Sequence, residues 1–160
     1  MSQIAVYFWI CFLSFLPVSE LRGAIPFAIA NGVPWHIAFI TAVCVNAMVA
    51  PFCWIFLSTL HRFFIRIDWY KHFFENFIDR ARNKLHKNVE RWGWLGITAF
   101  VAIPLPFTGA WTGTLGAWVL GVSKRRTMLA VILGVTIAGA VVSAVVLLGI
   151  QALNIFIKKG

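Results

Sequence analysis

Two uncharged stretches of the chain are long enough to cross a lipid bilayer as helices. The first runs from Pro34 to Leu60, and the second runs from Thr127 to Ile157. At about 1.5 Å of rise per residue, either helix exceeds a hydrocarbon core about 30 Å thick. We therefore predict transmembrane helices over 34–60 and 127–157, each tilted or protruding from the bilayer.

The other apolar stretches are shorter, and each pair of them is separated by helix-breaking residues. The first pair is separated by Pro17 and the polar residues 19–23, and the second by Pro104-Leu105-Pro106. None of the four pieces can cross a bilayer alone, so we predict two re-entrant helical hairpins, over 4–32 and 94–120. Broken segments at matching places in two halves of a membrane protein are a sequence sign of a transport site. The four short apolar runs are Ile4–Leu16, Ala24–Gly32, Leu95–Ile103 and Thr108–Leu120.

The two halves of the chain resemble each other when one is shifted by 89 positions. Small residues recur at every fourth place in both halves, which lines one face of a helix for close packing. We interpret the match as a diverged duplication; coincidence in a chain rich in alanine and glycine remains the alternative. The paired positions are Pro17 with Pro106, Ala24 with Gly113, Ala28 with Ala117, and Gly32-Val33 with Gly121-Val122.

Basic residues set the expected orientation. Most of them lie in 61–91 or in the run Lys124-Arg125-Arg126, and the positive-inside rule places both regions in the cytoplasm. The linker 61–93 and the loop 121–126 are then cytoplasmic, and the two hairpins open to opposite sides as an inverted repeat. We expect a multi-pass protein of the cell's inner, cytoplasmic membrane, although Lys158 and Lys159 would lie outside.

The linker 61–93 has the pattern of an amphipathic helix in the headgroup region. Its expected role is a cytoplasmic clasp between the halves, with lipid sensing as the functional alternative. Its apolar residues recur at steps of three or four: Phe63, Ile67, Tyr70, Phe74, Phe77, Ala81, Leu85 and Val89.

Composition supports one all-α membrane domain over residues 1–160. The chain is 61% hydrophobic and only 12% charged, about half the charged share of a soluble domain. Its net charge of +9 comes mainly from the two clusters beside apolar spans, so we expect no nucleic-acid partner. Three scattered cysteines form no metal motif, and no catalytic triad or paired carboxylates are present. We expect neither enzymatic activity nor a cofactor.

Glu20 and Arg22 are the only charges in the first predicted hairpin. A charge deep in a bilayer costs about 2.5–3.5 kcal/mol on insertion scales, so two charges at the predicted turn point to function. Glu20 could bind and release a proton, and Arg22 could hold an anionic group through paired hydrogen bonds. The structural alternative is a shallow hairpin whose charges touch interfacial water.

The second predicted hairpin presents polar backbone rather than charge. Prolines remove donors and glycines expose amides, so a broken turn here offers free N–H groups to a ligand. Thr108 could also cap the following helix. Asn46, midway along the first predicted span, is either a site residue or a hydrogen bond between helices. The candidate residues of the second hairpin are Pro104, Pro106, Thr108, Gly109, Thr112 and Gly113.

The stretches 19–26 and 102–113 resemble the two signature segments of the small multi-drug export protein family of bacteria and archaea. That resemblance covers nearly the whole chain and implies efflux of small molecules. The two-hairpin plan also resembles the DedA membrane proteins, which implies movement of polyprenyl-phosphate or phospholipid, with Glu20 and Arg22 as the charged tip residues. The second hairpin departs from the DedA pattern because it has no arginine.

The leading interpretation is a transporter that moves an amphiphilic substrate, such as a polyprenyl-phosphate or another lipid, through a midplane site between the hairpins. A proton-coupled multidrug exporter is the first alternative, and a non-transporting scaffold or assembly factor is the second. Membrane lipids and a second copy of the chain, forming a homodimer, are the expected partners.

Overall fold

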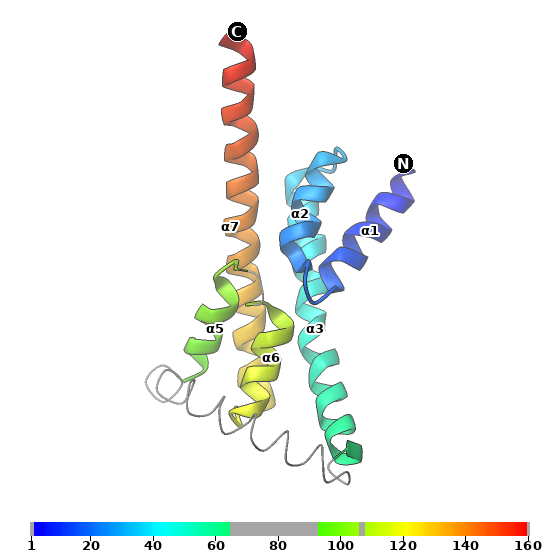
Figure 1. Cartoon of the computed structure of the whole chain (residues 1–160), viewed down its shortest axis with the longest axis vertical. Helices are drawn as coiled ribbons and strands as arrows, with labels where there is room; N and C mark the ends of the chain where they lie inside the picture. Colours follow the sequence, from blue (N-terminus) through cyan, green and yellow to red (C-terminus); the bar gives the residue numbers. More distant parts are fainter. Residues whose placement is uncertain (1, 65–92, 106–107, 160) are drawn as a thin grey trace.

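The protein is described by a computed structural model over residues 2–64, 93–105 and 108–159. Within these ranges it is entirely helical and contains no strand (Figure 1). The predicted all-α class is therefore confirmed for the described residues. The helices are α1 (Gln3–Phe15), α2 (Glu20–Ala30), α3 (Trp35–Phe64), α5 (Trp94–Ala102), α6 (Ala110–Val119) and α7 (Lys124–Lys159).

The two predicted long helices are present as α3 and α7. Stretches of 25 residues in α3 and 29 residues in α7 are long and apolar enough to cross a membrane. Helix α7 begins at Lys124, so the basic run forms its first turn, whereas the sequence indicated a loop over 121–126. The predicted amphipathic linker lies, from residue 65 to residue 92, outside the described residues.

The four short helices break close to the predicted places. They contain 13, 11, 9 and 10 residues, which gives lengths of about 14–20 Å. One expectation was wrong in detail: Glu20 and Arg22 lie in the first turn of α2, not in the connection before it. The amide of Glu20 bonds to the Leu16 carbonyl at 3.0 Å, so the chain reverses within one turn around Pro17.

The short helices form two pairs that approach each other from opposite ends of the molecule. Helices α1 and α2, the first helical pair, join near the middle of the long axis, and so do α5 and α6, the second helical pair (Figure 1). Helices α3 and α7 pack against each other and run past both joints. The two connections therefore meet at mid-height between the long helices.

Both pairs end in the same turn before the long helix that follows. Gly32 and Gly121 have φ of 81° and 70°, a conformation that favours glycine. The amide of Val33 bonds to the Ala28 carbonyl at 3.0 Å, and the amide of Val122 bonds to the Ala117 carbonyl at 2.9 Å. These are the positions that the shift of 89 aligns, so the two halves share this helix end in both sequence and hydrogen bonding.

Small residues allow the helices to pack closely, while large apolar side chains point outward. Ala24, Ala28 and Ala117 are fully buried, as the small-residue pattern predicted. By contrast, Ile40, Met48, Phe52, Ile55, Leu129, Leu133 and Ile137 are exposed. A soluble monomer seldom exposes so much apolar surface, whereas lipid tails solvate it well.

Gly134 on α7 lies at the closest approach of α5. A Cβ placed there would overlap the Val101 side chain and lie 2.9 Å from the Thr98 carbonyl oxygen, whereas a Cβ at Gly149 would meet nothing within 4 Å. We expect Gly134→Ala to destabilise the protein by about 1–3 kcal/mol through overpacking. The matched change Gly149→Ala should be neutral or stabilising, because alanine favours helix. Thermal unfolding of both variants in detergent checks this, and equal melting temperatures would contradict the packing described.

Candidate functional site

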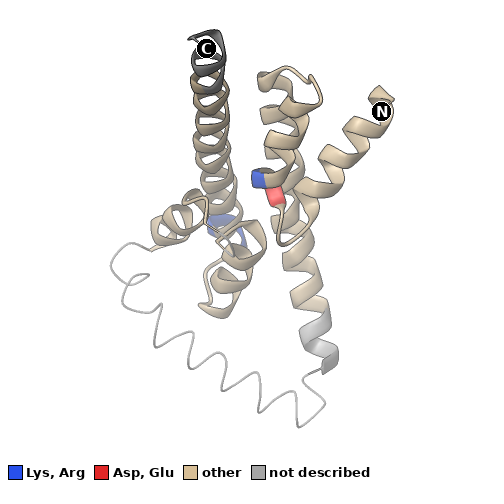
Figure 2. Ribbon diagram, turned by 45° about the horizontal axis from the view of Figure 1, so that its top comes forward, with Lys and Arg blue, Asp and Glu red and all other residues tan. Residues whose placement is uncertain are grey.

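The carboxylate of Glu20 reaches across the molecule to the start of α6. Its Oε1 accepts a hydrogen bond from the Trp111 amide at 3.5 Å. Gly109 lies directly against the carboxylate, so a Cβ there would overlap it. The Glu20 side chain is 3% exposed, and it is the only acidic side chain among the described residues (Figure 2).

Glu20 supplies the first turn of α6 with a negative charge. The first amides of a helix have no partner within the helix, and they carry partial positive charge. Gly109, the residue before α6, has no side chain with which to cap them. The Glu20 carboxylate, from the other helical pair, takes the place of the missing cap. It accepts a hydrogen bond from an α6 amide, which is thereby paired.

The backbone at Glu20 is itself unusual. Its φ of 48° makes it the only non-glycine residue with positive φ in the described part of the chain. This conformation is uncommon for residues with a Cβ and costs free energy, which surrounding contacts must offset. Here the conformation starts α2 immediately after Pro17 and places the carboxylate at the joint between the pairs.

Arg22 contacts the connection between α5 and α6, where it meets backbone and side-chain oxygens. Its guanidinium donates to the Leu105 carbonyl oxygen and, at 3.3 Å, to the Thr108 hydroxyl. Its Nε is buried and donates to no other group within the described residues. We call the contacts of Glu20 and Arg22 with residues 105–111 the tip contact.

Thr108 organises the connection rather than capping α6, so the predicted capping role was wrong. Its hydroxyl accepts from the Leu105 amide at 3.2 Å and lies 2.7 Å from the Ile103 carbonyl oxygen. The residue preceding α6 is Gly109, and its amide donates to the Thr112 hydroxyl at 3.0 Å. Thr108 therefore fixes the turn that presents its carbonyl groups to Arg22.

Asn46 is buried beside the tip contact. Its side chain is 0% exposed and lies close enough to interact with the Glu20 carboxylate. Neither amide atom forms a hydrogen bond of ordinary geometry among the described residues. A fully buried amide without partners is rare and calls for an explanation, and a polar group or water at this place would satisfy it.

Trp111 joins the second pair to the end of α1. Its indole N–H donates to the Phe15 carbonyl oxygen at 2.8 Å. Its ring packs edge-on against Phe15 and Phe52, with centroids 5.5 and 6.0 Å apart. Sequence reasoning missed the parts played by Phe15 and Phe52, because an aromatic residue beside lipid and one in a contact between helices have the same sequence pattern.

Most of the predicted site residues therefore meet at one place. Glu20, Arg22, Asn46, Thr108 and Gly109 form or line the tip contact, and Thr112 supports it through Gly109. Pro104 lies in the connection itself. Gly113 instead packs against Val101 within the second pair, and Pro106 lies outside the described residues.

Over residues 2–64, 93–105 and 108–159, these features define a helical membrane protein with two apolar helices of membrane-crossing length and a polar contact between two broken helical pairs. Residues 20–141, about three quarters of the chain, match the family described as "putative small multi-drug export protein". The chain belongs to this family. No curated protein and no solved structure matches it.

Removing the Thr108 hydroxyl should weaken the tip contact. Thr108→Ala leaves one Arg22 donor without its acceptor and removes one of the two acceptors of the Leu105 amide, which keeps its 2.8 Å bond to the Ile103 carbonyl oxygen. We expect a loss of about 1–3 kcal/mol of stability. Thr136→Ala is the matched control, because that exposed hydroxyl bonds only to the Ile132 carbonyl of its own helix. Thermal or denaturant unfolding in detergent measures both.

A double-mutant cycle tests whether the effect passes through Arg22. In an Arg22→Ala background the cost of Thr108→Ala should fall, because the two side chains interact directly. Additive losses would show that Thr108 acts only within its own connection.

Proposed function

We propose that this protein exports amphiphilic molecules across the membrane in exchange for protons, with the tip contact as its substrate and proton site. The observation that carries the proposal is the buried Glu20 carboxylate, held between two helical pairs beside the half-buried Arg22. Ionisable groups inside a membrane protein are expensive and generally serve binding or proton transfer. The family assignment supports export of small molecules.

We propose that both helical pairs are re-entrant and form an inverted repeat. Each short helix is about half as long as a bilayer core is thick, and the pairs meet tip to tip from opposite ends (Figure 1). The shared turns at Gly32 and Gly121 support a common origin. In this topology the basic first turn of α7 and the linker face the cytoplasm of the cell.

Protonation provides a way to open the tip contact. The ionised carboxylate is attracted to the start of α6 and to Arg22, and a neutral carboxyl group loses most of that attraction. Once the pairs separate, the α6 amides, the Asn46 amide and Arg22 need other partners. The polar end of a substrate supplies them, so binding of proton and substrate become coupled through one rearrangement.

Lipid translocation is a second candidate for the same site. The buried Nε of Arg22 has no partner among the described residues, and guanidinium groups hold phosphate through two or more parallel donors. A lipid phosphate, such as that of a polyprenyl-phosphate, would use this spare donor. With only two helices of membrane-crossing length in the described chain, we further propose that a homodimer encloses the path.

Transport can be measured in proteoliposomes with ethidium, a lipophilic cation, and with a fluorescent phospholipid as probes. We expect an imposed pH gradient to drive movement of one probe by the wild type. Glu20→Gln should lower that flux at least tenfold and abolish its dependence on the gradient, and Arg22→Ala should also lower it. Glu90→Gln and Arg80→Ala make the same chemical changes in the segment between α3 and α5 and serve as controls.

The choice of probe separates the candidates. Movement of ethidium alone supports drug export, and movement of the phospholipid alone supports lipid translocation. Unchanged flux in both Glu20→Gln and Arg22→Ala would remove the tip contact as the site. If the wild type moves neither probe, the proposal fails in favour of a non-transporting scaffold.

Sidedness tests the re-entrant topology. In a variant without Cys11, Cys44 and Cys53, we introduce single cysteines at Ser2, Asn31, Gly93 and Ser123. A membrane-impermeant maleimide should label positions 2 and 31 from one side, and positions 93 and 123 from the other. Labelling of 2 and 31 from opposite sides would mean that α1 and α2 together cross the bilayer once.

A further inference from the structure

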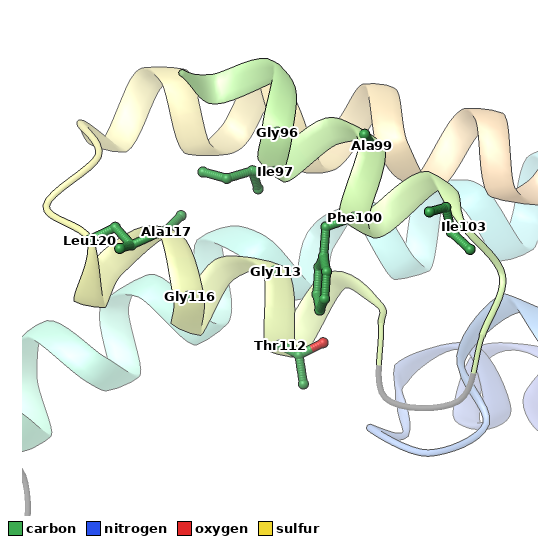
Figure 3. Close-up of a pocket in the computed structure, with 10 residues that line it drawn as sticks. All are labelled: Gly96, Ile97, Ala99, Phe100, Ile103, Thr112, Gly113, Gly116, Ala117 and Leu120. Atoms are coloured by element: carbon green, nitrogen blue, oxygen red, sulfur yellow. The ribbon is translucent and has the colours of Figure 1, made fainter. Parts of the chain in front are cut away.

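The second helical pair is not closed along its length. A groove of about 300 Å³ lies between α5 and α6 (Figure 3). Phe100 and Ile103 from α5 and its end face Thr112, Gly116 and Leu120 from α6 and its end across this space. Apart from the Thr112 hydroxyl, the side chains that line it are apolar. Its volume is at the lower end of the range for small-molecule sites, about 300–1,000 Å³.

Two glycines on α6 explain where the groove opens. A Cβ at Gly113 would overlap the Val101 side chain, so the two helices touch at that point. One turn later, a Cβ at Gly116 would meet nothing within 4 Å. From Thr112 to Leu120 the groove follows α6 for about 12 Å. Its shape suits a linear hydrocarbon chain lying along the helix.

The end of the groove at Leu120 lies four residues before the basic run that begins at Lys124. Lys124 follows Leu120 by four residues, so their Cα atoms are within about 14 Å of each other. Lys124, Arg125 and Arg126 are all exposed, and Lys124 and Arg125 border a shallow surface hollow with Met128 and Leu129. The described residues hold no acidic side chain at this end, because Glu20 lies at the tip contact.

We propose that this groove and the first turn of α7 form a binding site for one anionic phospholipid. One acyl chain lies between α5 and α6, and the phosphate lies against Lys124 and Arg125. The apolar lining favours a lipid acyl chain over a polar ligand. The cations of the first turn of α7 favour a negatively charged headgroup. The site is separate from the tip contact and does not depend on whether the protein transports.

The test uses the full chain in dodecyl maltoside and native mass spectrometry. Phosphatidylglycerol and phosphatidylcholine with identical acyl chains are titrated separately. We expect one phosphatidylglycerol to be retained per chain, with an affinity about tenfold higher than that for phosphatidylcholine, because the cations attract the net negative charge of its headgroup.

Four variants separate the acyl chain from the headgroup. Gly116→Leu, on α6, fills the groove and should reduce retention of both lipids at least tenfold. Gly149→Leu adds the same side chain at an open position on α7, away from the groove, and should not reduce retention. Lys124→Gln/Arg125→Gln should lower phosphatidylglycerol affinity about tenfold, to that of phosphatidylcholine. Lys158→Gln/Lys159→Gln, at the other end of α7, should have little effect.

Gly116→Ala guards against a folding defect in the leucine variant. Alanine fits the open space and favours helix, so this variant should fold at least as well as the wild type and bind lipid with intermediate affinity. Equal retention of the two lipids by the wild type would overturn the proposal. So would equal losses in Gly116→Leu and Gly149→Leu, or in the two double variants. Lipid retention is measured without transport, which keeps this result independent of the flux assay.

Discussion

The structure depends on an exchange of polar partners between two backbones that are each broken inside an apolar environment. A broken helix leaves amides and carbonyls without partners, and in lipid these cannot turn to water. The buried Glu20 carboxylate and the half-buried Arg22 guanidinium have the same difficulty. Glu20 caps the start of α6, and Arg22 holds the carbonyl side of the connection before it. The charged side chains of the first helical pair bond to the unpaired backbone groups of the second pair. This explains why the charges lie on one pair and the bare backbone on the other.

This reciprocity also restricts how the molecule can move. Separating the pairs exposes the α6 amides, Arg22 and the amide of Asn46 at once, so an open state is populated only where other polar groups replace the lost contacts. A ligand shifts such an equilibrium only by the difference between its affinities for the two states. In the proposed mechanism a proton would favour opening by neutralising Glu20, and a polar ligand would favour it by satisfying the freed donors. The same contact that holds the halves together is therefore suited to couple two binding events.

The sequence predicted the breaks well because their causes are local. Pro17 and Pro104 follow the ends of α1 and α5, where a proline cannot continue a helix, although Pro26 and Pro51 lie inside α2 and α3. The glycines at 32 and 121 adopt the positive φ that terminates α2 and α6. It did not predict the partners of those breaks, since Glu20 and Trp111 are 91 positions apart. Nor could it predict the left-handed conformation of Glu20, which tertiary contacts impose against the residue's own preference. The capping alternative for Thr108 was wrong because the residue before α6 is Gly109, one position later than the sequence suggested. The resemblance to DedA proteins stays a prediction.

The helices differ in whether their roles require particular residues. The residues that match the family include both sides of the tip contact, the groove between α5 and α6, and the basic first turn of α7. Helix α1 lies before them and contributes the Phe15 carbonyl to Trp111, a backbone group that any residue there would provide. Its other contribution is packing, through Val6 and Ile10, which other apolar residues of similar size could replace. The hydrogen-bonding role of α1 is thus set by its position, whereas the roles of Glu20, Arg22 and Gly109 require those particular residues: a carboxylate, a forked cation and the absence of a side chain.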